Sequence, residues 1–156
     1  MKIMDILSPE CVIPELQSED RDGVIKELLD VLVEHGKIEK GVEDKVFKEL
    51  IAREELGSTA IGNGIAIPHT KSEFVSELVS AFGISHKGVD FKALDGEKVY
   101  LFFLLVAPKE SAGPHLKALA RITRLLKDKN FRSILVQAKT REEAIKLIEE
   151  EDERYN

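Results

Sequence analysis

The 156-residue sequence contains a single cysteine, Cys11, and no apolar run that approaches the roughly 18 residues of a membrane-spanning helix. A lone cysteine excludes an intramolecular disulfide and a cysteine-rich metal site. The first ten residues, MKIMDILSPE, lack the apolar core of a signal peptide. We therefore expect a cytoplasmic protein with no direct membrane insertion.

Basic residues are outnumbered by acidic ones, with 23 Lys and Arg against 29 Asp and Glu and a formal net charge of −6. This balance argues against nucleic acid as the main partner and is compatible with a basic face on a protein partner. The hydrophobic fraction of 43% and the charged fraction of 33% are those of an ordinary globular protein. We expect a single domain over residues 1–156, with a core over about residues 6–149 and a charged, frayed C-terminal tail.

Three common catalytic motifs are missing as well. The glycines Gly62 and Gly64 lack the third glycine of a dinucleotide-binding loop, and no Gly-Lys-Ser/Thr follows them to form a P-loop. No second histidine lies at metal-ligand spacing from His69 or His115, so a zinc site is not expected. A serine hydrolase would need a Gly-x-Ser-x-Gly elbow, which the sequence does not contain.

The central motif of the chain is Ile61-Gly62-Asn63-Gly64-Ile65-Ala66-Ile67-Pro68-His69. Its glycines can take positive φ, and Ile65–Ile67 has the composition of a buried strand. Pro68 should end that strand because proline cannot donate to a sheet ladder. His69 is then expected just past the carboxyl end of a strand, where ligands gather in open α/β sheets. Taken alone, the stretch fits a turn and a core strand capped by a histidine equally well.

Strands and helices are predicted along the rest of the chain from hydrophobic periodicity and capping residues. Further strands are predicted over Cys11–Ile13, Leu78–Ile84 and Val99–Val106, the last being the most hydrophobic run and therefore central. The first predicted helix begins at a Ser18 cap and ends at His35-Gly36, and the second runs from Gly41 to Glu54. A third begins with Pro114 at its first helical position, a fourth covers Phe131–Ala138, and a fifth follows a Thr140–Glu143 capping box. His35 is explained by its helix end, and His86, in a predicted surface turn, is given no role.

Histidine can itself act as a nucleophile and accept a phosphoryl group on a ring nitrogen. Phosphoryl transfer asks the protein mainly for positioning and for electrostatic stabilisation of the equatorial oxygens. His115 falls in the first turn of a predicted helix, whose free N–H groups and positive dipole end favour an anion. Arg53 ends the preceding helix, and a short segment carrying Ser58 and Thr59 connects it to the central motif. We therefore expect Arg53 and both hydroxyls near His69.

The run from Glu54 through Ile61-Gly62-x-x-Ile65-Ala66-Ile67-Pro68-His69 resembles the active-site signature of the IIA components of the bacterial phosphoenolpyruvate-dependent sugar phosphotransferase system, in the fructose–mannitol (type 2) family. Pro114-His115-Leu116-x-x-Leu119-Ala120 is similar to the segment around that family's second histidine, and Arg53 aligns with an arginine kept near its site. The resemblance extends from about Ile6 to Glu149. Thr70 is a departure, because the family usually has Gly, Ala or Cys there; its hydroxyl is a candidate phosphate contact.

The resemblance implies an α/β fold with a central mixed β-sheet of about five strands and helices on both faces, which the predicted elements match. It also implies that Nε2 of His69 accepts a phosphoryl group from the phosphohistidine of HPr. The group then passes to a cysteine of a IIB component, while the membrane component IIC moves the sugar. His115 and Arg53 would stabilise the phosphohistidine and the transition state, and neither a metal nor another cofactor would be needed.

Two roles within this family are compatible with the sequence. One is the carrier for uptake of fructose or a related sugar, and the other is a nitrogen-related regulator that binds partner proteins according to its phosphorylation state. The stretches Asp90–Gly96 and Leu101–Pro108 look closer to the fructose transport type. Fructose-type uptake is therefore the preferred prediction and the regulator the alternative.

Overall fold

The computed structural model describes residues 1–60 and 62–155. Ile61, the first residue of the central motif, lies outside the described residues. Five described strands form one sheet in the order β1-β4-β5-β2, with β3 also paired to β5. The strands are β1 (Leu7–Ile13), β2 (Ile65–Ala66), β3 (His69–Ser72), β4 (Val79–Val89) and β5 (Val99–Pro108).

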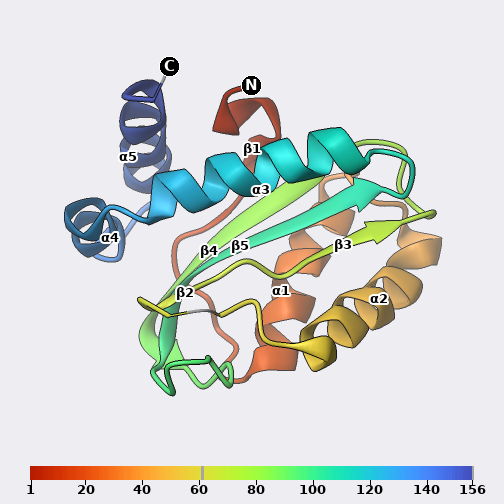
Figure 1. Ribbon diagram of the computed structural model, residues 1–156, viewed down its shortest axis with the longest axis horizontal. Coiled ribbons are helices and arrows are strands. Elements are labelled where there is room, and N and C mark those ends of the chain that lie inside the picture. The colour runs from red at the N-terminus through yellow and green to blue at the C-terminus, as the bar shows by residue number, and fades with distance from the viewer. Residues whose placement is uncertain (61, 156) are drawn as a thin grey trace.

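The sheet is mixed, because β4 and β5 are antiparallel while β1 is parallel to β4 and both β2 and β3 are parallel to β5. In Figure 1, α1 passes behind the sheet and α3 crosses in front of it. The predicted mixed sheet with helices on both faces is thus confirmed. The helices are α1 (Arg21–Glu34), α2 (Glu43–Leu56), α3 (Ala112–Leu126), α4 (Lys129–Leu135) and α5 (Arg141–Glu153), with 3₁₀ turns at Ile3–Asp5 and Lys40–Val42.

Strand β5 lies at the centre of the sheet, as its hydrophobic run predicts. It pairs with β4 on one side and with β2 and β3 on the other, and all residues from Leu101 to Ala107 are buried. A strand covered by helices on both faces needs apolar side chains at every position rather than at alternate ones. Phe103 packs on Phe82 of β4 with ring centroids 5.6 Å apart, and this contact belongs to the core.

Three strands are longer than predicted, among them β5, which continues from Val106 to Pro108. The strand predicted over Cys11–Ile13 begins at Leu7, and Pro9 is accommodated because β1 is an edge strand whose register shifts between Leu7 and Val12. The predicted surface turn at His86 is wrong, because this residue lies within β4. Its Nδ1 is 2.5 Å from Oε1 of Glu15 and its Nε2 is 3.1 Å from the carbonyl oxygen of Ala138. These contacts come from segments distant in sequence, so a local sequence pattern could not predict the position of His86.

The helix starts differ from prediction by a few residues. Asp20, not Ser18, caps α1, its Oδ1 accepting from the N–H of Gly23 at 2.7 Å. Helix α3 begins at Ala112, so Pro114 occupies the third helical position rather than the first. A missing N–H is tolerated there too, since first-turn N–H groups have no partner within the helix. The N-cap at Thr140 is confirmed, because its hydroxyl accepts from the N–H of Glu143 at 3.1 Å, but the Glu143 carboxylate accepts from the N–H of Lys139 instead of closing the predicted box on Thr140.

The remaining helix boundaries shift, and the C-terminal tail does not fray where predicted. Helix α2 spans 43–56 instead of 41–54, and α4 spans 129–135 instead of 131–138. Helix α5 continues to Glu153, and Asp152 near its end is only 5% exposed. Its carboxylate accepts from the N–H of Ile3 and from Nε of Arg121, both at 2.7 Å. These two contacts of Asp152 hold the end of α5 in place, although the charged composition of the tail had suggested that it would fray.

The connection from β2 to β3 places His69 differently from prediction. His69 is the first residue of β3 rather than a residue beyond the end of a strand. Pro68 interrupts the pairing, yet its carbonyl accepts from the N–H of Leu105 at 2.9 Å, so the ladder with β5 resumes at once. Upstream, Gly62 and Gly64 have φ of 136° and 74°, the conformations for which glycine is required.

Candidate functional site

His69 is held at its main chain and at one ring nitrogen. Parallel pairing with Leu105 fixes its main chain, and Nδ1 lies 2.7 Å from the carbonyl oxygen of Ile67. A carbonyl oxygen can only accept, so Nδ1 carries the proton in this arrangement. The lone pair of the imidazole is then on Nε2, with the ring orientation set by a short local bond.

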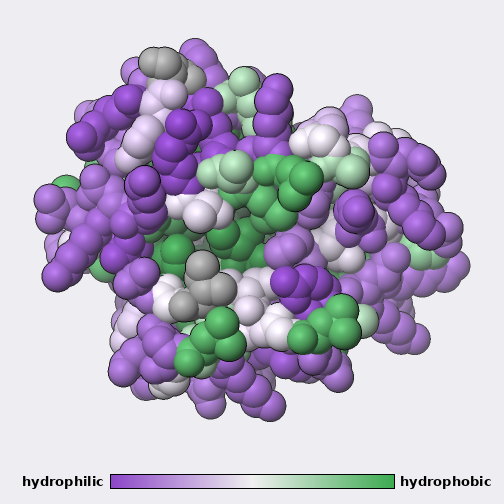
Figure 2. All heavy atoms as spheres, viewed as in Figure 1, coloured by the Kyte–Doolittle hydropathy of each residue, from purple (hydrophilic) through white to green (hydrophobic). Residues whose placement is uncertain are grey.

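A cavity of about 460 Å³ opens beside this ring. Strand β3, the last two turns of α2 and the first turn of α3 contribute its walls. The lining residues are Glu49, Ala52, Arg53, Leu56, His69, Thr70, Lys71 and His115. On the face of the molecule shown in Figure 2, apolar side chains gather below α3, and hydrophilic residues cover most of the remaining surface. Four of the six predicted site residues, Arg53, His69, Thr70 and His115, therefore share one cavity.

The second histidine lies against the first. The rings of His69 and His115 have centroids 5.5 Å apart and are tilted by 46°. His115 is 6% exposed, and its buried Nδ1 has no hydrogen-bond partner within the described residues. A buried polar atom without a partner is uncommon, and such atoms often belong to functional sites.

Burial lowers the pKa of both imidazoles below the usual histidine value. For His69 the hydrogen bond to Ile67 opposes this effect, while the positive charge of Arg53 adds to it. For His115 the neighbouring His69 and the charge of Lys71 lower the pKa further. Both rings are consequently neutral at pH 7, which is the state in which Nε2 of His69 can act as a nucleophile.

Arg53 contributes a positioned positive charge. Its Nη1 donates to the carbonyl of Gly57 at 2.7 Å, so the side chain folds back on the C-terminus of its own helix. The other guanidinium donors remain available to the cavity that Arg53 lines. Its influence on the pKa of His69 shows that the two groups interact electrostatically.

The predicted hydroxyls are distributed unevenly. Thr70 lines the cavity, with its Oγ1 3.2 Å from the carbonyl oxygen of Lys71. Neither Ser58 nor Thr59 lines it. The Ser58 hydroxyl lies 3.4 Å from the carbonyl oxygen of Phe91. The Thr59 hydroxyl donates to Glu54, whose carboxylate also accepts from the Thr59 N–H at 3.1 Å. Those two hydroxyls support the turn after α2 instead of facing His69.

Sequence reasoning gave no role to Lys71 or Glu54, both of which act on the site. Lys71 lines the cavity, and its charge lowers the pKa of His115. Glu54 is 3% exposed, and its negative charge raises the pKa of His69. Glu54 begins the run that resembles the family signature, and Lys71 lies next to Thr70 in the chain, but neither signal carries information on side-chain direction.

The arrangement can bind and hold a dianion next to a neutral imidazole. Arg53 and Lys71 supply positive charge, and His115 supplies a ring that can donate a hydrogen bond. No cluster of three or more His, Cys, Asp or Glu side chains placed to hold a metal occurs within residues 1–60 and 62–155. In the same part of the chain, no helix has the length and apolar character needed to cross a membrane.

Solved structures with this fold include the nitrogen regulatory protein IIA-Ntr of Neisseria meningitidis. It superimposes with a TM-score of 0.84 at 29% identity, over 94% of this chain and 98% of the other. The model of the phosphoenolpyruvate-dependent sugar phosphotransferase system EIIA 2 family matches residues 5–151. The chain therefore belongs to this family, the phosphoryl-transfer EIIA components of type 2.

Two relatives represent two branches of the family. A nitrogen regulatory protein of Bradyrhizobium diazoefficiens is 40% identical over 131 residues, which are 84% of each chain. A fructose-specific EIIABC component of Bacillus subtilis is 36% identical over 153 residues, or 97% of this chain. The match covers only 24% of the Bacillus protein, so it concerns one part of a much longer polypeptide.

Proposed function

We propose that His69 is the phosphoryl acceptor of this protein and that Nε2 is the atom phosphorylated. The observation that carries the proposal is the 2.7 Å contact between Nδ1 and the Ile67 carbonyl, which leaves the Nε2 lone pair for the incoming group. The donor is the phosphohistidine of HPr. The bond from phosphorus to the donor imidazole breaks as the bond to Nε2 forms, and Nδ1 keeps its proton throughout.

The residues around Nε2 have complementary parts in this step. Arg53 and Lys71 line the cavity and balance the negative charge of the phosphoryl oxygens, and His115 donates a hydrogen bond to one of them. The Thr70 hydroxyl is a further phosphate contact. Glu54 works in the opposite sense, because its buried negative charge makes His69 more basic. No metal or cofactor takes part in this proposal.

We further propose that the protein is a regulator that binds partner proteins according to the phosphorylation state of His69. The sequence motifs alone favoured fructose-type uptake, but the Bradyrhizobium regulatory protein at 40% identity and the Neisseria IIA-Ntr fold support the regulatory role more strongly. The site suits such a switch. The cavity is bordered by Leu56, which is 86% exposed, and a dianionic group placed beside an apolar contact surface changes which partners can dock.

Fructose-type uptake is the second candidate, supported by 36% identity to the Bacillus fructose-specific protein. In that role His69 passes its phosphoryl group to a cysteine of a IIB component, and the membrane component IIC moves the sugar. The chemistry at His69 is the same in both roles. Only the identity of the protein that receives the group, or that senses it, differs.

Intact-protein mass spectrometry after incubation with phosphoenolpyruvate, enzyme I and HPr tests the shared chemistry. One acid-labile phosphoryl adduct that maps to His69 is expected. Phosphorylated HPr together with an unmodified protein would contradict the proposal.

Affinity capture with the phosphorylated and the unphosphorylated protein separates the two roles. A regulator should retain one set of partners in one state only, and its phosphoryl group should stay on the protein when a fructose-type IIB component is added. Rapid transfer of the group to the IIB cysteine would instead support uptake.

A further inference from the structure

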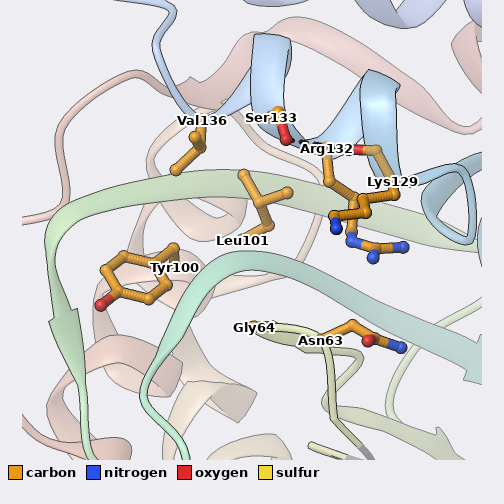
Figure 3. A pocket seen from close by; sticks show the side chains of 8 residues that line it. All are labelled: Asn63, Gly64, Tyr100, Leu101, Lys129, Arg132, Ser133 and Val136. Carbon is orange, nitrogen blue, oxygen red and sulfur yellow. Dashed lines mark hydrogen bonds between the residues drawn. The ribbon is translucent and has the colours of Figure 1, made fainter.

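A second cavity, distinct from the one at His69, lies between α4 and the β2–β5 edge of the sheet. Its volume is about 250 Å³. Figure 3 shows Lys129 and Arg132 extending from α4 on one side, Asn63 and Gly64 of the turn before β2 on the other, and Tyr100 and Leu101 of β5 between them. Nothing in the chemistry proposed for His69 uses these side chains.

The charged groups of this cavity are all positive. Lys129 and Arg132 are one helical turn apart, and their charged ends extend to the same side of α4 (Figure 3). Neither forms an ion pair with a carboxylate within residues 1–60 and 62–155, and no Asp or Glu lines the cavity. Two unpaired cations side by side repel each other unless an anion lies between them.

The guanidinium of Arg132 is held in place before any ligand arrives. Its Nη1 donates to the carbonyls of Leu126 and Lys127, at 3.0 and 2.7 Å, at the end of α3. Among the described residues, no hydrogen bond uses its Nε or Nη2. Donors fixed by the protein lose little freedom on binding, which favours affinity.

The other walls set the size and character of a ligand. Leu101 is 2% exposed and forms an apolar floor together with the ring of Tyr100 and the side chain of Val136. An apolar cavity of about 150 Å³ holds a benzene molecule, and drug-sized ligands occupy about 300–1,000 Å³. The volume of about 250 Å³ therefore suits an organic ligand slightly larger than benzene.

The cavity is separated from the phosphoryl site along the sheet. Leu101 pairs with Ile65 of β2, whereas His69 pairs with Leu105, four residues further along β5. At about 3.3 Å per residue, this places the two sites about 13 Å apart. The turn at Asn63 and Gly64 is nevertheless connected to His69 by only β2, Ile67 and Pro68. The carbonyl of Gly64 accepts hydrogen bonds from the N–H groups of Tyr100 and Leu101.

We propose that this cavity binds a small organic anion, a carboxylate or phosphate monoester, with its charge between Lys129 and Arg132 and its apolar body against Leu101 and Tyr100. The carboxylate or phosphate accepts from Lys129 Nζ and from the guanidinium donors that Arg132 has free. A ligand here contacts the turn that leads into His69.

Nuclear magnetic resonance titration of the full chain with benzoate, phenyl phosphate and the neutral compound benzyl alcohol tests the proposal. We expect saturable shifts of the amides of Gly64, Tyr100, Leu101 and Ser133 with at least one of the two anions and none with benzyl alcohol. Shifts with benzoate alone identify a carboxylate site, and shifts with phenyl phosphate alone identify a phosphate site. No saturable shift with either anion overturns the proposal.

The variant Lys129→Gln removes one charge from an exposed side chain whose loss should not affect folding. It should weaken binding about fivefold or more, since a charge-assisted hydrogen bond is lost. The matched control is Lys127→Gln, an exposed lysine two residues away that does not line the cavity. Equal affinity in both variants would overturn the proposal even if the anion binds. Phosphorylation of His69 by HPr is measured separately, so failure here leaves that assignment unaffected.

Discussion

The cavity at His69 and the cluster around Asp152 both take charged or polar side chains out of water, but they treat them in opposite ways. Both carboxylate oxygens of Asp152 have partners at 2.7 Å, one in Arg121 of α3 and one in the backbone of Ile3. At the other site, buried Nδ1 of His115 has no partner among the described residues, and Nε2 of His69 faces a cavity.

The difference separates a structural cluster from a working site. A buried charge whose partners are all present stabilises one arrangement of the chain and has nothing left to bind. A buried group with unused capacity costs stability unless a ligand or reaction uses it. Helix α3 takes part in both, with His115 in its first turn and Arg121 further along, so the cluster holds the helix that presents the second histidine.

The largest effect is expected from His69→Ala, which removes the nucleophile. Phosphoryl acceptance from HPr should be lost, while the free energy of unfolding should change by less than about 1.5 kcal/mol. Mass spectrometry and urea denaturation measure the two quantities. The control is His35→Ala, at the exposed C-terminal end of α1, which should still be phosphorylated. A His69→Ala protein modified at the rate of the original would refute the assignment.

Asp152→Ala is expected to give the reverse pattern. Removing the carboxylate should lower the free energy of unfolding by about 1–3 kcal/mol, because the buried Ile3 N–H loses its acceptor and Arg121 loses its charged partner. The fraction that remains folded should accept phosphoryl groups normally. Urea denaturation beside Glu153→Ala, an exposed neighbour, tests this. Equal stability of both variants would remove the contrast between the two regions.

His115→Ala should leave His69 able to accept a phosphoryl group but slow the return of that group to HPr about 100- to 1,000-fold, the usual cost of losing one donor to a developing charge. Stopped reactions with a fixed amount of phosphorylated protein measure that rate. His115→Gln retains a hydrogen-bond donor and should recover part of it. Unchanged transfer in the alanine variant would remove the supporting role of His115.

Thr59→Val tests whether the turn after α2 contributes to stability or to the phosphoryl site. The hydroxyl bonded to Glu54 is lost, so the free energy of unfolding should fall by about 1–3 kcal/mol. Thr59→Ser keeps the hydroxyl and should behave much more like the original protein in thermal denaturation. If valine changed only phosphorylation and not stability, Thr59 would belong to the site after all.

The smallest expected effect is on the pH dependence of stability. Both His69 and His115 have pKa values below 6.5 in the folded protein, while the unfolded chain binds protons near that value. The unfolded state therefore holds more protons as the pH falls below 6.5, and stability decreases there, whereas these two residues contribute no pH dependence at higher pH. Urea denaturation across this range should show a shallower decrease for the His69→Ala/His115→Ala double variant. An identical slope would mean that other groups cause the decrease.

Much of the fold could be predicted, because its main signals are local. The run Val99–Val106 identified the central strand, since only a strand covered on both faces needs apolar side chains throughout. Capping at Thr140 and the C-terminal end of α1 followed from residues next to each other in the chain. The extent of β1 and the position of His86 could not be read in the same way, because segments distant in sequence pair with them.

The candidate site was predictable in its members more than in its geometry. The motif Pro68-His69 and the pair Pro114-His115 pointed to the residues that meet across one cavity. The bond from Nδ1 to Ile67, the separation of Ser58 and Thr59 from the cavity, and the entry of Lys71 all depend on side-chain direction. Sequence spacing carries almost no information about that direction outside regular elements.

By itself, the sequence determined the α/β class, the central strand and the two histidines, since hydrophobic periodicity and short motifs are properties of neighbouring residues. The tertiary structure alone decided that one ring nitrogen of His69 is occupied and the other open. It also decided that Asp152 anchors the C-terminal helix and that Lys129 and Arg132 share a cavity. The Asp152 contacts and the cavity that Lys129 and Arg132 share with β5 join separate elements, whereas the bond from His69 to Ile67 is local in sequence. In all three cases the burial and pairing exist only once the chain has folded.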